Sequence, residues 1–241
     1  MNIEYQYPGE ELHLFEHATN WKNYFAKYIV PFIKGNVLEV GAGIGETTPY
    51  LINYRVKEWT CLEPAATLFS LLTKKKETEK LPGNCRLVHG RLDALPSSVK
   101  YDTILYIDVL EHIENDSKEI HSAVSRLNKG GHLIIISPAY QFLYNPFDKS
   151  IGHCRRYTKK TIRKTVAENS LAEVKLFYLE ITGILLLAFN KLLFRKKYPN
   201  RWVIKFWDGF LIPISRILDK VVFHSMGKSI VGIWEYKQNN K

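Results

Sequence analysis

One short stretch of the chain combines an acidic residue with closely spaced glycines. It reads Glu39-Val40-Gly41-Ala42-Gly43-Ile44-Gly45 and follows an apolar run. Residues without a Cβ adopt positive φ and leave backbone amides open, so a turn of this kind between a strand and a helix brings the backbone close to a ligand. The stretch therefore predicts a loop that binds a nucleoside-containing ligand.

The spacing of the glycines separates two classes of ligand. A dinucleotide fingerprint G-x-G-x-x-G that began at Gly41 would need its third glycine at position 46, where this chain has Glu46. The third glycine, Gly45, comes one residue earlier. A loop this compact, led by Glu39, suits a nucleoside that carries an amino acid and no pyrophosphate. The spacing favours S-adenosylmethionine over NAD as the cofactor.

Acidic residues follow the next two predicted strands. Glu63 ends the second strand, where a carboxylate can accept hydrogen bonds from both ribose hydroxyls. Asp93 follows the third strand and is placed to accept a hydrogen bond from an adenine amino group. Two alternatives stay open, because a strand-end glutamate can simply be solvated and an aspartate in such a place is often a turn former.

These motifs resemble those of class I S-adenosylmethionine-dependent methyltransferases. The similar part runs from about residue 35 to residue 178 and points to the broad small-molecule group (types 11 and 12) that includes ubiquinone-biosynthesis-type enzymes. The resemblance implies that the glycine loop holds the methionine portion and that Asp108 lies beside the cofactor's amino group or the transferred methyl. It also implies a ribose and adenine site, made by Glu63, Pro64, Arg91, Leu92 and Asp93.

Two histidines are candidates for the chemistry, together with Asp108. Methyl transfer from a sulfonium is an in-line displacement, and a base near neutral pH assists it when the acceptor must lose a proton. His112 follows the fourth strand, and His153 lies in a run after the fifth. The alternatives are a packing role for His112 and a solvated loop around His153.

The run that contains His153 also carries candidate acceptor contacts. It reads Gly152-His153-Cys154-Arg155-Arg156-Tyr157 and resembles a run in methyltransferases that accompany glycosyltransferases in cell-surface sugar pathways. Two adjacent arginines can bind phosphate or carboxylate bidentately. We therefore expect Arg155, Arg156 and Tyr157 to contact the acceptor, with Tyr140 as a further candidate.

The elements that must position these residues alternate between strand-like and helical patterns. Five short apolar runs with helical stretches between them are typical of a parallel sheet that is covered on both faces. They span residues 36–40, 59–63, 86–89, 101–107 and 132–137, and two more candidates follow at 174–179 and 229–236. We predict a doubly wound α/β fold with a mostly parallel, seven-stranded, Rossmann-like sheet.

The rest of the chain is expected to be helical around that sheet. A helical apolar period from residue 12 to about 33 predicts one amphipathic helix. We expect an N-terminal helical cap (1–34) and a methyltransferase domain (35–241) with a helical insertion (183–228). The cysteines, Cys61, Cys85 and Cys154, have no metal-ligand spacing, so no metal site is predicted. Their odd number and the absence of an apolar leader favour the cytoplasm.

The charge is distributed unevenly. The formal net charge is +10, and residues 149–164 contain seven Lys or Arg and no acid, while residues 183–224 contain eight bases and two acids. The apolar run at 184–189 is far shorter than the ~20 residues that span a bilayer. Residues 202–213 mix aromatics with lysine as an interfacial helix does. The insertion is therefore either a lid or a docking element for an anionic membrane surface, which would place the protein at the inner membrane face.

Three other functions compete with methylation of a small molecule. An RNA methyltransferase is disfavoured because residues 108–111 contain no Asn-Pro-Pro-Tyr-like motif and no RNA-binding module is evident, so nucleic acid is not the expected partner. Nicotinamide-dependent redox chemistry is disfavoured by the glycine spacing, and a non-catalytic membrane-docking protein by the intact cofactor motifs. We expect methyl transfer to an oxygen or nitrogen of a small, anionic or lipid- or sugar-linked acceptor.

Overall fold

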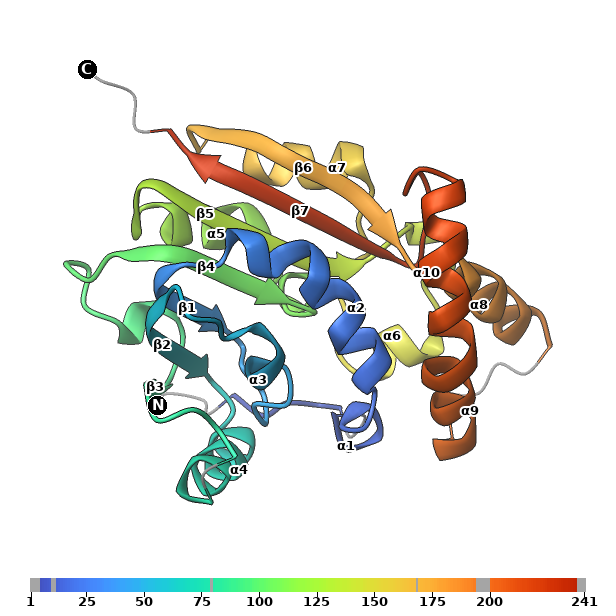
Figure 1. Ribbon diagram of the computed structural model, residues 1–241, viewed down its shortest axis with the longest axis horizontal. Helices are drawn as coiled ribbons and strands as arrows, with labels where there is room; N and C mark the ends of the chain where they lie inside the picture. The colour runs from blue at the N-terminus through green and yellow to red at the C-terminus, as the bar shows by residue number, and fades with distance from the viewer. Residues whose placement is uncertain (1–4, 10–11, 79, 168, 194–199, 238–241) are drawn as a thin grey trace.

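The computed structural model describes residues 5–9, 12–78, 80–167, 169–193 and 200–237. Its centre is a seven-stranded sheet of order β3-β2-β1-β4-β5-β7-β6 (Figure 1). The strands are β1 (Gly35–Val40), β2 (Val56–Glu63), β3 (Cys85–His89), β4 (Tyr101–Ile107), β5 (Leu127–Pro138), β6 (Leu171–Leu179) and β7 (Ser229–Tyr236). The first five are parallel, and β7 runs antiparallel to both β5 and β6. The predicted doubly wound α/β fold is confirmed.

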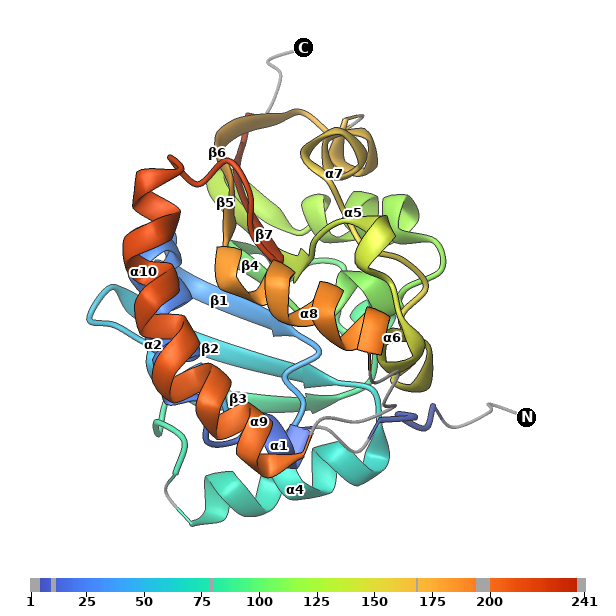
Figure 2. The same ribbon diagram turned by 90° about the vertical axis from the view of Figure 1, so that its right-hand side faces the viewer.

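Helices cover both faces of the sheet, as Figure 2 shows. One face packs on α5 (Asp116–Val124) and α7 (Lys159–Val166), and the other packs on α2 (Thr19–Ile29) and on the helices between β6 and β7. Alternate side chains of a strand point to opposite faces. Leu38 of β1 and Tyr106 of β4 therefore join the α5 side, whereas Val37 and Leu105 join the α2 side.

The helices between β6 and β7 form the predicted insertion. They are α8 (Ile181–Leu193), α9 (Arg201–Phe206), the π-helical turn η5 (Trp207–Leu211) and α10 (Ile212–Val221). The last three follow one another as a single rod beside α2 (Figures 1 and 2). None of the described helices is long and apolar enough to cross a membrane.

Buried carboxylates attach this insertion to the rest of the molecule. Asp208 accepts hydrogen bonds from the backbone N–H groups of Asn20 (3.1 Å) and Trp21 (2.9 Å), so it caps the start of α2, which has no side-chain cap of its own. Asp219 accepts from the Tyr24 hydroxyl (2.8 Å) and from the Glu180 amide (2.6 Å). Asp208 and Asp219, the two acidic residues of the insertion, therefore both bind groups of the protein itself.

The N-terminal helical region differs from its prediction. Where the period predicted one helix from residue 12 to about 33, the chain forms α1 (Leu12–Phe15), α2 and the 3₁₀ turn η1 (Val30–Phe32). The break before α2 is stabilised by Asp208 from the insertion. The 12-residue helix α4 (Ala66–Glu77) connects β2 to β3 and packs beside them. The remaining short elements are α3 (Thr48–Leu51), η2 (Leu92–Ala94), η3 (Leu110–His112), η4 (Gln141–Leu143) and α6 (Pro146–Ser150).

Candidate active site

A cavity of about 1380 Å³ opens at the carboxyl ends of β1 and β4. The strand order reverses there, since β1 lies between β2 on one side and β4 on the other. Doubly wound sheets bind their ligands at such a switch point. The cavity extends from the glycine loop after β1 to the helices α2, α8 and α9.

The glycine loop has the backbone conformation that its residues predict. Gly41, Gly43 and Gly45 have φ of +68°, +57° and +73°. A Cβ at Gly41 would lie 2.6 Å from the Val109 side chain, and one at Gly45 would lie 2.6 Å from Leu72. Only glycine combines this φ with these contacts. Gly41, Ala42 and Gly43 line the cavity directly, and Gly45 packs behind them.

Glu39 supports the loop from below and also borders the cavity. It is buried, and its Oε2 accepts hydrogen bonds from Thr48 Oγ1 (2.6 Å) and Trp59 Nε1 (2.8 Å). Burial raises the pKa of its carboxyl to about 7, although both hydrogen bonds oppose that rise. Glu39 therefore connects the loop to β2 and α3.

Glu63 holds the loop from the neighbouring strand. Its Oε2 accepts from the Gly43 N–H and its Oε1 from the Ala65 N–H, both at 2.8 Å. Burial raises the pKa of its carboxyl, and the two backbone bonds lower it. Each carboxylate oxygen has a second lone pair, so Glu63 can accept two further bonds from the cavity that it lines.

The predicted adenine-side residues lie farther along the same rim. Pro64, Arg91, Leu92 and Asp93 all line the cavity. The Asp93 side chain is exposed, which leaves its carboxylate open to a ligand.

A polar cluster faces the loop from the other side of the cavity. Asp108 follows β4 with φ of +52°, a strained conformation for a residue with a Cβ, and its side chain is accessible because it borders the cavity. Burial of the site raises the pKa of Asp108, and the positive charges of His153, Lys228 and Arg156 partly offset this rise. Asp108 thus brings a carboxyl group beside the glycine loop.

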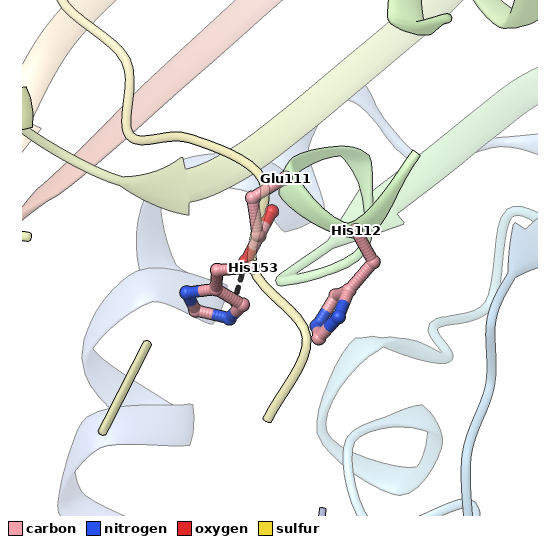
Figure 3. Close-up of side chains that lie close together, drawn as sticks. All are labelled: Glu111, His112 and His153. Atoms are coloured by element: carbon pink, nitrogen blue, oxygen red, sulfur yellow. Dashed lines mark ion pairs between the residues drawn. The ribbon is translucent and has the colours of Figure 1, made fainter. Parts of the chain in front are cut away.

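His153 and His112 meet in this cluster (Figure 3). Their rings lie edge to face with centroids 4.6 Å apart. Nδ1 of His153 is 2.8 Å from Asp148 Oδ1, and Nε2 is 3.7 Å from Glu111 Oε1. Burial, followed by the charge of His153, lowers the pKa of His112 to about 3, so that imidazole is neutral at neutral pH.

Comparison with known proteins identifies the chain. A family model described as "Methyltransferase domain" matches residues 11–175. This protein belongs to that family. The predicted class I S-adenosylmethionine-dependent methyltransferase is thereby confirmed, and with it S-adenosylmethionine as the cofactor and the assignment as an enzyme.

Solved structures are similar to this methyltransferase in fold. An S-adenosylmethionine-dependent methyltransferase from Clostridium acetobutylicum has a TM-score of 0.60 at 12% identity, with 93% of this chain and 97% of that chain covered. Magnesium protoporphyrin IX methyltransferase from Synechocystis, with bound S-adenosylhomocysteine, has a TM-score of 0.58 at 16% identity (92% and 84% covered). Phosphoethanolamine N-methyltransferase 2 from Haemonchus contortus, in complex with S-adenosylmethionine, gives 0.62 at 12% identity (93% and 57% covered).

The residues present fit this cofactor. The loop at Gly41 and Gly43 has no Cβ to fill the space above it, and the Glu63 carboxylate faces the cavity with lone pairs to spare. Residues that the sequence analysis missed complete this side. Tyr5 lines the cavity under the Arg91 guanidinium (5.2 Å to the ring centroid), and Tyr7 lies 5.6 Å from the His112 ring. The sequence gives little sign of these two residues, since a pair of tyrosines in a short polar segment is the only local feature that marks them.

The predicted acceptor contacts of the methyltransferase separate into two groups. Arg156 borders the cavity, where its guanidinium binds Asp148 bidentately (Nε to Oδ1 2.9 Å, Nη2 to Oδ2 3.0 Å). The other three residues lie outside the cavity lining. Arg155 pairs with Asp116 (2.8 Å), the Tyr157 hydroxyl donates to the same carboxylate (2.8 Å), and Tyr140 stacks on Tyr178 (4.9 Å).

One part of the cavity, called the arm below, is lined mainly by apolar side chains, with Lys22 and Asn200 also in the lining. Helices α1, α2, α8 and α9 and the turn η5 surround it, and its lining includes Phe15, Trp21, Phe25, Leu186, Ile204 and Trp207. Lys228 lies where this arm meets the polar cluster. Its ammonium pairs with Glu180 (3.0 Å) and lies 4.5 Å from the centre of the Trp207 ring. The methyltransferase therefore has one continuous cavity with a polar and an apolar end.

Proposed function

We propose that this enzyme methylates an oxygen or nitrogen at the polar end of an acceptor whose apolar part occupies the arm lined by Phe15, Trp21 and Trp207. The single observation that supports this proposal is the continuity of the arm with the glycine loop and the histidine cluster. A lipid-linked sugar or a quinone precursor has this combination of a polar reacting group and an apolar tail. Burial of such a tail contributes about 0.8 kcal/mol per CH₂.

On the cofactor side, the enzyme's own residues bind S-adenosylmethionine and orient it. S-adenosylmethionine supplies a methyl group on a sulfonium. The loop backbone at Gly41 and Gly43 and the carboxyl of Glu39 bind the amino-acid end, and Glu63 accepts from the ribose hydroxyls. Leu92 and Asp93 contact the adenine edge. Because Glu63 also holds Gly43, ribose binding and loop conformation depend on one carboxylate.

On the acceptor side, His153, His112 and Asp108 contact the reacting group and assist the loss of its proton. Hydrogen bonds from His153 and Arg156 outweigh the effect of burial and keep the pKa of Asp148 low. Because an ionised carboxylate only accepts hydrogen bonds, Nδ1 of His153 carries a proton, and the neutral form of the ring has its lone pair on Nε2. This makes His153 the best placed of the three groups.

The acceptor is proposed to be anionic on the strength of two cations at the junction. Arg156 and Lys228 both border the cavity, and each already has a carboxylate partner, Asp148 and Glu180. A phosphate or carboxylate on the acceptor would share these cations with their internal partners. Binding of the acceptor's anionic group to these paired cations therefore contributes less to affinity than binding to unpaired cations would.

The test is a series of acceptors that differ only in alkyl tail length. We expect kcat/KM to rise about fourfold for each added CH₂ that enters the arm, which is 0.8 kcal/mol expressed as a rate ratio. Phe15→Asp should remove this dependence, while Phe142→Asp, at a side chain that is 65% exposed and outside the lining, should preserve it. If kcat/KM does not change with tail length, the arm does not bind the acceptor.

We also propose that the insertion docks on an anionic membrane. Large apolar side chains lie exposed along the α9–α10 rod at helical spacing: Trp202 (78%), Phe206 (54%), Phe210 (55%), Ile217 (67%) and Val221 (66%). Positions four or seven apart share one face of a helix. Exposed bases flank the stripe, at Arg201, Lys205 and Lys220. Because Asp208 and Asp219 are buried, the described surface of the rod is cationic.

Sedimentation with liposomes tests the docking. The full chain should bind vesicles that contain phosphatidylglycerol more tightly than neutral phosphatidylcholine vesicles, and added salt should weaken that binding. The double variant Trp202→Ser/Phe206→Ser should lose vesicle binding and keep its affinity for S-adenosylmethionine. Tyr54→Ser, at a 96% exposed aromatic in the connection between α3 and β2, is the control. Equal sedimentation of all three proteins would refute the docking.

A further inference from the structure

The cluster of Glu111, His112 and His153 has the composition of a metal site. Each residue offers one ligand atom, and the three atoms lie within 4.8 Å of one another. All three residues line the cavity, and they converge from two segments distant in the sequence (Figure 3). The donor set is two imidazoles and one carboxylate, which suits a transition metal better than Mg²⁺ or Ca²⁺.

Two atoms of the cluster lack any partner. Glu111 is fully buried, and its Oε1 makes no hydrogen bond, since His153 Nε2 is 3.7 Å away. Nδ1 of His112 is likewise buried and makes no hydrogen bond within the usual distance, although the backbone of Gly152 and Ile151 opposes the fall in the pKa of that ring. A buried polar atom without a partner costs about 1–3 kcal/mol. Two such atoms, in residues whose ligand atoms lie within 4.8 Å of one another, are the second observation that points to a bound ion.

The groups behind the cluster fix the orientation of its donors. Asp148 accepts from Nδ1 of His153, which directs Nε2 toward Glu111. Ser137 donates to Oε2 of Glu111 (3.0 Å), which leaves Oε1 for the site. Histidines that bind a metal usually donate their other ring nitrogen to a carboxylate in this way. Arg156 in turn holds Asp148, so the arrangement is rigid.

We infer that Glu111, His112 and His153 bind one divalent transition-metal ion, Zn²⁺ being the best match, at the acceptor end of the cavity. Ligands of tetrahedral zinc lie about 3.4 Å apart, given metal–ligand bonds near 2.0–2.2 Å. The 3.7 Å between Glu111 and His153 is close to that value. Three protein ligands leave one coordination position for an acceptor atom, as in catalytic zinc sites.

This site deepens the proposed function and rests on it for its role in catalysis. A divalent ion lowers the pKa of an acceptor hydroxyl, so its proton passes to Asp108 or to solvent. The oxygen then forms a bond to the methyl carbon while the sulfur–methyl bond breaks, and the bonding pair stays on sulfur. The charges balance, because the neutral product S-adenosylhomocysteine replaces the sulfonium and one proton is released.

Metal binding can be measured without any acceptor. After treatment with a chelator, the full chain is titrated with Zn²⁺ by calorimetry and with Co²⁺ by visible absorption. The background is Cys154→Ser, because that exposed thiol lies near His112 and could bind zinc by itself. We expect one Zn²⁺ per chain and the absorption bands of four-coordinate Co²⁺. His153→Ala and His112→Ala should each weaken binding at least about 100-fold.

His132→Ala is the matched control. His132 also has a buried, unpaired Nδ1, but it lies on β5 outside the cavity lining, so its loss should leave zinc affinity unchanged. Melting curves in chelator verify that each variant folds. If zinc fails to bind, or binds the His153→Ala and His112→Ala variants as tightly as the Cys154→Ser background, the metal site is refuted. Turnover that persists in chelator would then leave His153 as a direct base, so the proposed function would stand without the metal.

Discussion

Replacing Glu39 by glutamine is expected to stabilise the methyltransferase at pH 8 and much less at pH 5. Burial raises the pKa of Glu39 to about 7 from a reference value of 4.5. Between these pH values the folded chain keeps a proton that the unfolded chain releases, so the free energy of unfolding falls as the pH rises through this window. Below pH 4.5 the carboxyl is neutral in both states, and above pH 7 the full cost of a buried charge is present.

The magnitude follows from the shift. One pKa unit corresponds to 1.36 kcal/mol, so ionisation of Glu39 costs about 3 kcal/mol in total, of which about 2–3 kcal/mol falls between pH 5 and pH 8. Glutamine does not ionise. Thr48 and Trp59 both donate to the same oxygen, Oε2, so the amide oxygen of glutamine can keep both hydrogen bonds. The variant should therefore avoid the loss that the wild type undergoes.

Urea unfolding at pH 5, 6.5 and 8, without cofactor, measures this effect. The quantity of interest is the difference in the free energy of unfolding between Glu39→Gln and wild type, which should increase by about 2–3 kcal/mol across the range. Glu58→Gln, at an exposed position on the neighbouring strand β2, should show a difference that does not change with pH. If the Glu39→Gln difference is also constant, or if the variant is less stable at pH 8, this account of Glu39 is wrong.

Three further substitutions test the site and the attachment of the insertion. Gly45→Ala should lower the free energy of unfolding in urea by about 1–3 kcal/mol, because the added Cβ would lie 2.6 Å from the Leu72 side chain at a φ of +73°. Gly83→Ala is the control, since a Cβ there meets nothing within 4 Å and should not change the free energy of unfolding in this way. Glu63→Gln should weaken S-adenosylmethionine binding at least about tenfold in calorimetry, because its amide nitrogen would face a backbone N–H; unchanged affinity would contradict the ribose assignment. Asp208→Asn should lower the free energy of unfolding by about 1–3 kcal/mol, because its amide nitrogen would face a backbone N–H at the start of α2. An unchanged melting temperature would show that this cap is dispensable.

The sheet and the glycine loop could be predicted from the sequence because their signals are local. Each parallel strand is a short apolar run, and the positive φ of Gly41 and Gly45 is a property that glycine alone supplies at little cost. The start of α2 could not be predicted in this way. Its cap, Asp208, is distant in the sequence, and the apolar period across the break gives no sign of an interruption.

The acceptor side was predicted less completely for a similar reason. The sequence indicates that Arg155 and Tyr157 can bind an anion or a sugar, but not that Asp116 already occupies both. It also does not show that Asp148 lies behind His153. Partners of this kind depend on tertiary packing, and the expectation that the chain has no metal site was based on cysteine spacing alone. The zinc site proposed above uses two histidines that no local motif connects.

The run from Gly152 to Tyr157 is better explained as the support of one imidazole than as an open binding surface. Its charged side chains have internal partners, since Arg156 binds Asp148 and Arg155 binds Asp116. The buried Arg156 and Asp148 are costly to desolvate, and a buried ion pair often contributes little to stability. What this pair does provide is a fixed carboxylate behind His153. That carboxylate directs the Nε2 lone pair toward Glu111 at the junction of the polar and apolar ends of the cavity. Both a direct base and a metal ligand require that lone pair in a fixed position, so the same support serves the proposed function with or without the ion.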